Sequence, residues 1–563
     1  MSLKRFLLVR VGRLISYPIR RQLRLFEVAC QDPEAVQTEL LLSILRKQQN
    51  TAFGQDHKFA SIRSVADFRN NNPIAPYEHV APYIERVMKG ETNALLSAKR
   101  VHLFALTSGT TASRKLIPVT DDYLNAYKRG WNMWGVKMYR DNRGRKVAMR
   151  PIMQMAGDPE EFRTEAGIPC GNLSGYTAMV QKRLIRGMYA VPYITGKIKD
   201  AKARYYVALR CSVTRNVSQF MAANPSTLVQ FARVLDAEKE HLLRDLRDGT
   251  LRTDLDIPPD IRAELSRKLG KDATKAAQLG AIAEKSGRLF PTDVWPVEGT
   301  VINTWTGGSM GPYLRQLPQY FGEPPIRDLG LLASEGRMTI PFEAGTPGGV
   351  LDIWSHYFEF VPESEIDSPQ PTVLGAHQLA EGESYYIIPT TAYGLYRYHI
   401  SDLVRVTGFF GRTPIVEFLG KGHRFSNMTG EKLSEYHVTK AMDAVVKRQP
   451  LPITAYSLAP VWNEHQSYYG LFLEEADVAD DDAVRRFLGD FDRQLGLENI
   501  EYAAKREGGR LGPVRVVVIP TGTWAKWDRA RLTQTGGSPE QYKHPCLIGD
   551  LKFRDSMTVL REM

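Results

Sequence analysis

A loop rich in hydroxyl and glycine residues follows a short apolar run early in the chain. Residues 101–106 (VHLFAL) have the composition of a buried strand, and a loop follows them. Backbone N–H groups and hydroxyls in such a loop can bind phosphate oxygens, and Lys115 just beyond it supplies a positive charge. The same residue types also build ordinary turns, so the loop alone leaves both interpretations open. This hydroxyl loop consists of Thr107, Ser108, Gly109, Thr110 and Thr111.

A second candidate stretch carries a carboxylate at the expected end of a strand. Residues 328–336 (DLGLLASEG) end an apolar run in Ser334 and Glu335. A carboxylate in that place can hold Mg²⁺ against phosphates, which makes Glu335 the candidate metal ligand and Ser334 a candidate nucleotide contact. The alternative is a glutamate that lies on the surface beside a glycine.

Two later stretches add an aspartate and a lysine. Residues 394–408 (GLYRYHISDLVRVTG) contain Asp402, which can accept both hydroxyls of a ribose, and Tyr396, a further candidate nucleotide contact. An aspartate that caps a turn is the alternative. Residues 535–545 (TGGSPEQYKHP) place Lys543 in a turn-rich loop, where a lone lysine is ordinarily solvated.

The composition is that of a globular protein of more than one domain. The chain has 563 residues, 43% of them hydrophobic, and no apolar run of the roughly 18 residues that a membrane span needs. The four cysteines form no CxxC pair, which predicts a reducing, cytoplasmic location. Of the net charge of +11, seven basic residues stand in residues 1–25, so we expect no nucleic-acid partner for the rest of the chain.

The basic N-terminal arm, residues 1–25, mixes arginines with apolar residues at partly helical spacing. Such a segment can lie on an anionic membrane surface. A solvated helix packed on the body of the protein is the commoner use of this pattern, and it is the interpretation we prefer.

The order of elements predicts two domains. A helix is expected over residues 35–49, and long helices over residues 219–247 and 259–286. Residues 294–420 change to short strands separated by glycine and proline. Beyond a glycine-containing hinge, a helix, two strands, a helix and a strand form a small α+β unit, so we place a large domain at residues 1–423 and a mobile one at 424–563.

Taken together, these stretches resemble the adenylate-forming ligase superfamily. More closely, the chain is similar to the auxin-responsive acyl acid amido synthetases, the jasmonate- and indoleacetate-conjugating family of plants with bacterial relatives, and we expect a bacterial-type member. The similarity covers nearly the whole chain and is carried by TSGTTASRKLIPVT, YRYHISDLVRVTGFFGRTPIVEFLGK and GGSPEQYKHP. It implies an α/β fold, with a large N-terminal adenylate-forming domain of mixed sheets flanked by helices and a small α+β C-terminal domain.

The resemblance also implies roles for single residues. The hydroxyl loop contacts the phosphates of ATP, with Lys115 assisting. Glu335 corresponds to the magnesium-associated glutamate and Asp402 to the ribose-binding aspartate. Lys432 corresponds to a lysine beyond the hinge that reaches the α-phosphate, and Lys543 to a second cation.

The chain departs from the family pattern at several positions. Leu331 and Leu332 stand where many relatives have Tyr-Gly, Ser401 where a glycine is usual, and His399 where an arginine is common. The resemblance therefore implies the activation chemistry without carrying over a particular acid.

The chemistry implied is ATP-dependent amide formation. A carboxylic acid attacks the α-phosphorus of ATP with Mg²⁺ present, pyrophosphate leaves, and the amine of an amino acid then displaces AMP. Coenzyme A is an alternative acceptor, and a non-enzymatic binding protein is a further alternative. Residues 307–311 also match G-x-S-x-G, so a serine hydrolase that uses Ser309 is another alternative.

Overall fold

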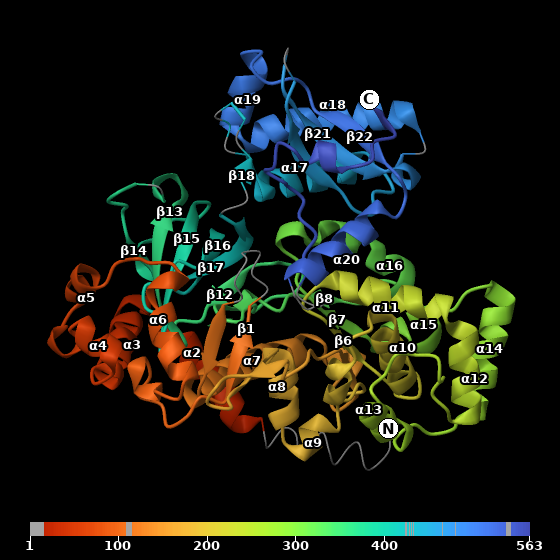
Figure 1. Cartoon of the computed structure of the whole chain (residues 1–563), viewed down its shortest axis with the longest axis horizontal. Coiled ribbons are helices and arrows are strands. Elements are labelled where there is room, and N and C mark those ends of the chain that lie inside the picture. Colours follow the sequence, from red (N-terminus) through yellow and green to blue (C-terminus); the bar gives the residue numbers. More distant parts are fainter. Residues whose placement is uncertain are drawn as a thin grey trace.

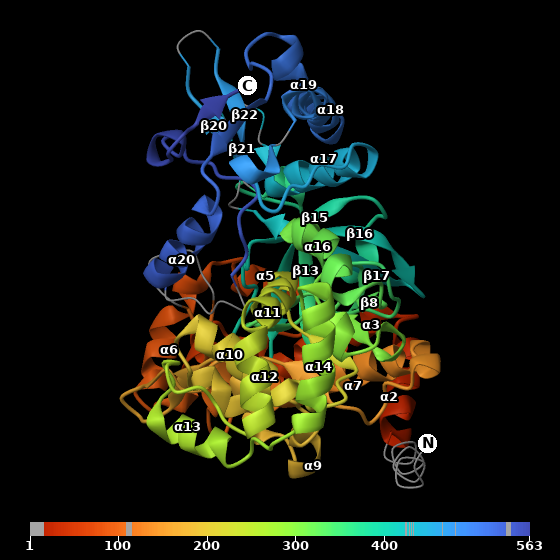
Figure 2. The ribbon, with the colours of Figure 1, turned by 90° about the vertical axis from the view of Figure 1, so that its right-hand side faces the viewer.

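The structure consists of a large body and a smaller C-terminal unit that lies against one side of it (Figure 1). Figure 2 shows the C-terminal unit above the body in a second view. This arrangement agrees with the expected mixed α/β fold of a large N-terminal and a smaller C-terminal part. The computed structural model describes residues 16–107, 115–366, 368–422, 425–426, 428–429, 431, 433–463, 466–478, 480–535 and 542–563.

One sheet of the body is parallel and has the order β3-β6-β7-β8. Gln154, Met221 and Asn303 are register partners at the carboxyl ends of its first three strands. The residues that follow these ends therefore meet at one edge, which is where open α/β sheets bind ligands. The strands are β3 (Ile152–Gln154), β6 (Gln219–Met221), β7 (Val301–Asn303) and β8 (Ile326–Arg327).

A second sheet contains the strand predicted ahead of the hydroxyl loop. In the order β2-β1-β5-β4, β1 pairs antiparallel with β2 and parallel with β5. Every residue of β1 is buried, which explains its continuously apolar sequence. The predicted strand is confirmed, although it begins at Leu103. The strands are β1 (Leu103–Leu106), β2 (Leu116–Val119), β4 (Phe162–Arg163) and β5 (Pro169–Gly171).

The third sheet is antiparallel throughout and fills the region where short strands were expected. Its order is β11-β12-β17-β16-β15-β13-β14. A separate hairpin, β9 and β10, precedes it in the chain. The bounds are β9 (Leu332–Ala333), β10 (Gly336–Arg337), β11 (Thr339–Ile340), β12 (Gly349–Leu351), β13 (His356–Pro362), β14 (Leu374–Gly375), β15 (Ser384–Thr391), β16 (Asp402–Phe410) and β17 (Thr413–Lys421).

Helices flank these sheets, and local capping explains where several of them begin. The predicted helix near residue 35 is α3, which starts after Asp32, whose carboxylate accepts the N–H of Ala35 at 3.2 Å. The helices of the body are α2 (Tyr17–Ala29), α3 (Pro33–Gln48), α4 (Ala52–Asp56), α5 (Val65–Asn71), α6 (Ala81–Met88), α7 (Asp121–Asp141), α8 (Leu173–Val180), α9 (Arg183–Arg186), α10 (Ala201–Ser212), α11 (Pro225–Ala237), α12 (Lys239–Asp248), α13 (Pro259–Ser266), α14 (Ala273–Ser286), α15 (Pro291–Val294) and α16 (Gly311–Phe321).

Both long helices predicted from composition are wrong in extent. Residues 219–247 contain β6 followed by α11 and most of α12, because β6 pairs with strands on both sides and Asn224 caps a new helix. Residues 259–286 contain α13 and α14, since Asp272 caps a second helix there. Helix propensity is a weak preference that sheet pairing and capping override.

The C-terminal unit is an α+β arrangement with a core of its own. Its sheet has the order β20-β21-β22-β23, in which β21 and β22 are parallel. The predicted helix, two strands, helix and strand are confirmed, whereas α20 was not predicted. The predicted boundary at residues 423 and 424 lies outside the described residues. The elements are β18 (Phe425–Ser426), β19 (Leu433–Ser434), α17 (Glu435–Arg448), β20 (Ser457–Val461), β21 (Tyr468–Glu474), α18 (Asp481–Glu498), α19 (Ile500–Glu507), β22 (Arg515–Ile519), α20 (Thr523–Thr535) and β23 (Arg561–Glu562).

Part of the basic N-terminal arm forms α2, which packs on the body. Phe26, the first residue beyond the arm, is fully buried, and its ring meets those of Phe342 and Trp354 edge-on. This agrees with a helix packed on the body for the described part of the arm, while residues 1–15 lie outside the described residues. Within the described ranges, no helix has both the length and the apolar character to cross a membrane.

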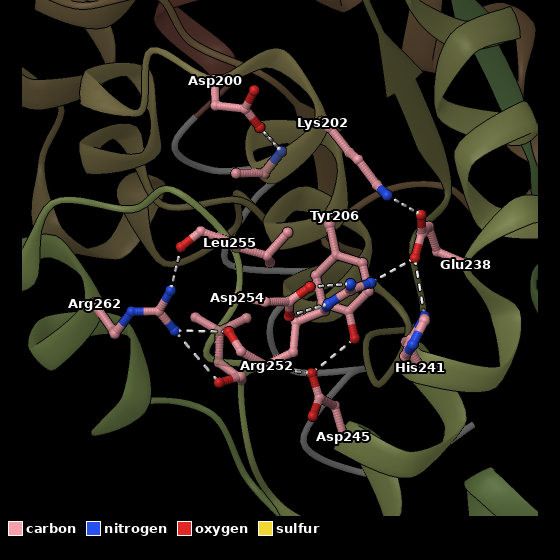
Figure 3. A network of polar contacts seen from close by, with 12 residues as sticks. Asp200, Lys202, Tyr206, Glu238, His241, Asp245, Arg252, Asp254, Leu255 and Arg262 are labelled. Atoms are coloured by element: carbon pink, nitrogen blue, oxygen red, sulfur yellow. Dashed lines mark hydrogen bonds and ion pairs between the residues drawn. The ribbon is translucent and has the colours of Figure 1, made fainter.

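A network of polar side chains ties α10, α12 and the loop after α12 together (Figure 3). Asp245 accepts hydrogen bonds from the Tyr206 hydroxyl at 2.7 Å, the Thr250 hydroxyl at 2.7 Å and the backbone N–H of Arg252 at 2.8 Å. The carboxylate of Glu238 contacts the side-chain nitrogens of Lys202, His241 and Arg252. Since α10 and α11 pack together beside the parallel sheet, this network holds helices that support the sheet edge.

We expect Asp245→Ala to destabilise the body by about 2–4 kcal/mol, because it removes the acceptor of three hydrogen bonds, one of them from the buried Tyr206 hydroxyl. The midpoint of urea unfolding, followed by circular dichroism, measures this. Asp248→Ala is the matched control, since Asp248 is exposed and pairs only with its neighbour Arg247 in the described part of the chain. That control should change stability by no more than about 0.5 kcal/mol, and equal losses in the two variants would contradict the role of the network.

Candidate active site

A cavity of about 390 Å³ lies between the body and α20 of the C-terminal unit. The candidate residues gather on its wall from the ends of β1 and β2, the turn of the β9-β10 hairpin, the start of β16 and the segment after α20. The candidates brought together are Thr107, Lys115, Ser334, Glu335, Asp402 and Lys543. Those outside the described residues are Ser108, Gly109, Thr110, Thr111 and Lys432.

Thr107 and Lys115, which flank residues 108–114, lie side by side at the cavity. The N–H of Thr107 donates to the carbonyl of Lys115 at 3.2 Å, because β1 and β2 are antiparallel neighbours. The Thr107 hydroxyl is buried and has no hydrogen-bond partner among the described residues. A buried hydroxyl in that state gains stability when a ligand supplies the missing partner.

The β9-β10 hairpin places Ser334 and Glu335 in its turn. Ser334 Oγ donates to the carbonyl of Leu106 at 2.8 Å, and the Tyr123 hydroxyl donates to the carbonyl of Ser334 at 2.9 Å. The Tyr393 hydroxyl donates to the carbonyl of Glu335 at 2.7 Å. These bonds fix the turn to the end of β1, so the carboxylate of Glu335 is held at the cavity.

Glu335 is a buried acid whose side-chain contact in the described part of the chain is long. The Tyr398 hydroxyl lies 3.5 Å from its Oε1, and Lys115 Nζ lies 3.2 Å from that same hydroxyl. Burial raises the pKa of Glu335, while the positive charges of Lys421 and Lys115 oppose the rise. The arrangement leaves a carboxylate whose charge a bound cation would stabilise.

Asp402 stands at the first position of β16, opposite Lys421 at the last position of β17. The two side chains form an ion pair, and Lys421 Nζ also donates to the carbonyl of Ile400 at 3.1 Å. Asp402 lines the cavity although it is only 3% exposed. A carboxylate held in this way can accept hydroxyl hydrogen bonds from a ligand.

Ser401, which replaces the glycine usual in the family, occupies a left-handed backbone conformation with φ of 64°. This region favours glycine, which explains the residue expected there. Here the Ser401 hydroxyl lies 2.9 Å from Nδ1 of His399, the other departure in this stretch. The two unusual residues therefore stabilise one turn that leads into Asp402.

Lys543 reaches the cavity from the C-terminal unit. Its Nζ lies 4.3 Å from the ring centre of Trp305 and 4.8 Å from that of Phe418, both on the body. Cation–π contacts of this kind hold a cation without neutralising it. These contacts place the ammonium group of Lys543 at the wall of the cavity.

The remaining wall is mostly apolar. Met153, Met155 and Met221 come from the carboxyl ends of β3 and β6. Leu331 and Leu332, in place of the Tyr-Gly of many relatives, also line the cavity. One part of the wall is therefore suited to an uncharged organic group, and the charged residues come from other elements.

The structure does not bring Tyr396 to the cavity. Its ring stacks on Phe53 and meets Phe59 edge-on within the core. Tyr398, two positions later, lines the cavity instead. Sequence reasoning missed Tyr398 and Lys421, although both stand inside the stretch that carries the resemblance. The identity of the side chain that faces inward depends on a turn that composition does not reveal.

Ser309 lines the cavity in a short 3₁₀ turn between β7 and α16. Among the hydrogen bonds of the described residues, none joins its hydroxyl to a histidine or an acid. A serine nucleophile needs such a base in contact with it. The structure therefore gives the hydrolase alternative no support.

Three stretches of the chain match the domains of one family. They are the GH3 family N-terminal domain at residues 22–326, the central domain at 349–421 and the C-terminal domain at 436–552. The chain belongs to the GH3 family. GH3 amido synthetases are ATP-dependent acid–amino acid ligases, so the predicted family and enzyme class are confirmed.

Individual GH3 relatives are distant but match along most of their length. The chain is 24% identical to the jasmonoyl-L-amino acid synthetase JAR4 of Nicotiana attenuata, over 93% of this chain and 92% of that protein. It is 22% identical to the indole-3-acetic acid-amido synthetase GH3.4 of Arabidopsis thaliana, over 96% and 94%. These relatives come from plants, and a bacterial type stays a prediction.

A solved GH3 structure shows the same fold. The GH3.15 acyl acid amido synthetase in complex with 2,4-DB superimposes with a TM-score of 0.82 at 20% identity, over 97% of each chain. This confirms the coarse architecture of a large N-terminal domain followed by a C-terminal domain.

The residues of the cavity fit a magnesium ion that arrives with a nucleotide. Mg²⁺ is usually held by one or two carboxylates together with water and phosphate oxygens. Glu335 supplies one such carboxylate, and no group of three or more acidic, histidine or cysteine side chains within the described ranges forms a metal cage. Glu335 would therefore hold the ion together with the ligand.

We expect Glu335→Gln to raise the thermal unfolding midpoint at pH 7.5, with the gain vanishing near pH 4. Burial raises the pKa of Glu335 in the folded protein, so the native chain loses stability as pH rises through that pKa and the acid ionises. The amide of the variant does not titrate, so the variant does not lose this stability. Differential scanning calorimetry across this pH range measures the difference. Glu381→Gln, at an exposed position, is the control and should show no such pH-dependent gain. A lower midpoint for Glu335→Gln at pH 7.5 would contradict the unpaired charge.

Proposed function

We propose that this GH3 protein adenylates a carboxylic acid with ATP, releases pyrophosphate, and transfers the acyl group to the amine of an amino acid with release of AMP. The supporting observation is the division of one cavity between charged groups and an apolar wall. The charged groups suit a nucleotide, and the apolar wall suits the acid. Family membership supports an amine as the acceptor. A cytoplasmic location stays a prediction.

The first step requires an acid carboxylate to attack the α-phosphorus while negative charge builds on the departing pyrophosphate. Lys115 of the body and Lys543 of the C-terminal unit both line the cavity and can stabilise that charge, while Asp402 orients the ribose. When bound, Mg²⁺ would neutralise phosphate charge as a Lewis acid. Holding the two substrates in contact accounts for much of the rate.

In the second step, the amine of the amino acid must reach the acyl carbon of the acyl-adenylate and displace AMP. Among the described residues, polar contacts between the C-terminal unit and the body include the ion pair of Arg315 with Asp443 at 2.7 Å and a bond from Gln316 to the carbonyl of Thr454 at 3.2 Å. Polar contacts of this kind can break without disturbing the core of either part, so the unit can reorient between the steps, and we place the hinge at residues 420–424. Structures with ATP and with AMP that share one domain angle would contradict the reorientation.

The central test measures pyrophosphate release from Mg-ATP with a panel of aryl, indolyl and fatty acids, with and without pooled amino acids. We expect release that depends on an acid and rises with amino acids. Glu335→Gln should lower kcat by about 100-fold or more, the size of effect seen when one electrostatic stabiliser is removed. Glu381→Gln is the matched control and should keep normal activity.

Other outcomes of that test point to different functions. A thioester product with coenzyme A and no amide would replace the amine by a thiol acceptor. Absence of both pyrophosphate release and ATP binding by calorimetry would overturn the nucleotide assignment. Activity lost in Ser309→Ala, with hydrolysis of an ester substrate, would restore the hydrolase alternative.

Removal of divalent cations gives an independent prediction. Chelation with excess EDTA should abolish pyrophosphate release, and added Mg²⁺ should restore it. Since no metal cage was found within the described ranges, chelation should leave the unfolding midpoint unchanged. A large loss of stability with EDTA would instead indicate a structural metal.

A further inference from the structure

A carboxylate of α20 binds the segment that carries Lys543 at two points. Asp528, on α20, receives the Tyr542 hydroxyl at 2.7 Å and lies 2.8 Å from Nδ1 of His544, and both contacts use the same oxygen. The two partners flank Lys543 in the sequence. One side chain of α20 therefore binds both neighbours of the lysine.

The contacts of the three consecutive residues explain why this attachment orients the lysine. The residues on both sides of Lys543 bind Asp528, while Lys543 itself contacts two aromatic rings of the body. Tyr542 and His544 face α20, and Lys543 points away from it onto Trp305 and Phe418. A substitution at Asp528 would weaken the contacts with Tyr542 and His544, and these contacts set the direction of the Lys543 side chain.

Further contacts fix His544 and the chain beyond it. The His544 ring meets Trp524 edge-on with ring centres 4.7 Å apart, and its Nε2 lies 3.1 Å from the hydroxyl of Ser457 on β20. The backbone then joins β20, since Leu458 N–H donates to the carbonyl of Cys546 at 2.9 Å. These contacts hold the segment on the C-terminal side of Lys543. Asp528 adds the hydrogen bonds to the two residues directly beside the lysine.

The same segment also touches the body. The side-chain amide of Asn224, which caps α11, donates to the carbonyl of Tyr542. The carbonyl beside Lys543 thus meets the body, while the Tyr542 ring meets α20. Both contacts place the lysine at the cavity with its unit in the present orientation.

We propose that Asp528 is a positioning residue for the reaction: by binding Tyr542 and His544 together, it directs the ammonium group of Lys543 into the active-site cavity. The inference rests on the proposed function, in which Lys543 stabilises phosphate charge. Asp528 is not among the described residues that line the cavity, and in this inference it acts through the two flanking residues.

A double-mutant cycle tests this assignment with pyrophosphate release as the readout. Asp528→Asn should lower kcat by about 10-fold while changing KM for ATP and for the acid less than about threefold, because a misdirected cation mainly affects the transition state. In the Lys543→Ala background, Asp528→Asn should have no further effect, since the residues act as one unit. Asp550→Asn, at an exposed position of the same unit, is the matched control and should be unchanged.

The outcomes separate this inference from the proposed function. Normal kcat in Lys543→Ala would remove the proposed role of that lysine, and the inference with it. Impaired Lys543→Ala together with normal Asp528→Asn, or with fully additive effects, would overturn the inference alone. If Asp528→Asn does not fold, Tyr542→Phe carries the same test, because it removes only one hydroxyl from the carboxylate and should lower kcat by about threefold. Normal kcat in that variant would then overturn the inference.

Discussion

The burial of one carboxylate, that of Glu335, is the constraint on which the site depends. Three hydrogen bonds fix the surrounding hairpin turn to β1 and to two tyrosines, and the Glu335 side chain is buried there. Among the described side chains, the Tyr398 hydroxyl at 3.5 Å is the hydrogen-bond partner of this carboxylate. Such a charge reduces the stability of the free protein and favours a bound cation, which is how a binding site differs from a well-satisfied core.

The second feature of the site is that its cations belong to two separately packed parts. Lys115 and Lys421 belong to the body, whereas Lys543 comes from a unit with its own hydrophobic core. The aromatic rings of Trp305 and Phe418 on the body contact Lys543. Cation–π and polar contacts of this kind between the C-terminal unit and the body can break and form again. Such reversible contacts suit a reaction in which pyrophosphate leaves before the amine arrives.

Rules that act within a few residues predicted much of the fold. They failed where pairing between strands far apart in the sequence determined the secondary structure. Strand β1 and helix α3 followed from an apolar run and an aspartate cap, both of which act within a few residues. Strand β6 was taken for helix, because its side-chain composition suits both and only β3 and β7 make it a strand. Helix α20 was not predicted, although it carries Asp528 and covers the cavity.

The sequence by itself determined the family, because the stretches that carry the resemblance are recognisable from residue type and order. Tertiary structure alone decided that Thr107, Glu335, Asp402 and Lys543 share one cavity, and that Tyr396 lies in the core while Tyr398 faces the site. The reason is physical: residue type sets what a side chain can do, whereas its direction depends on sheet register and on packing between segments far apart in the chain.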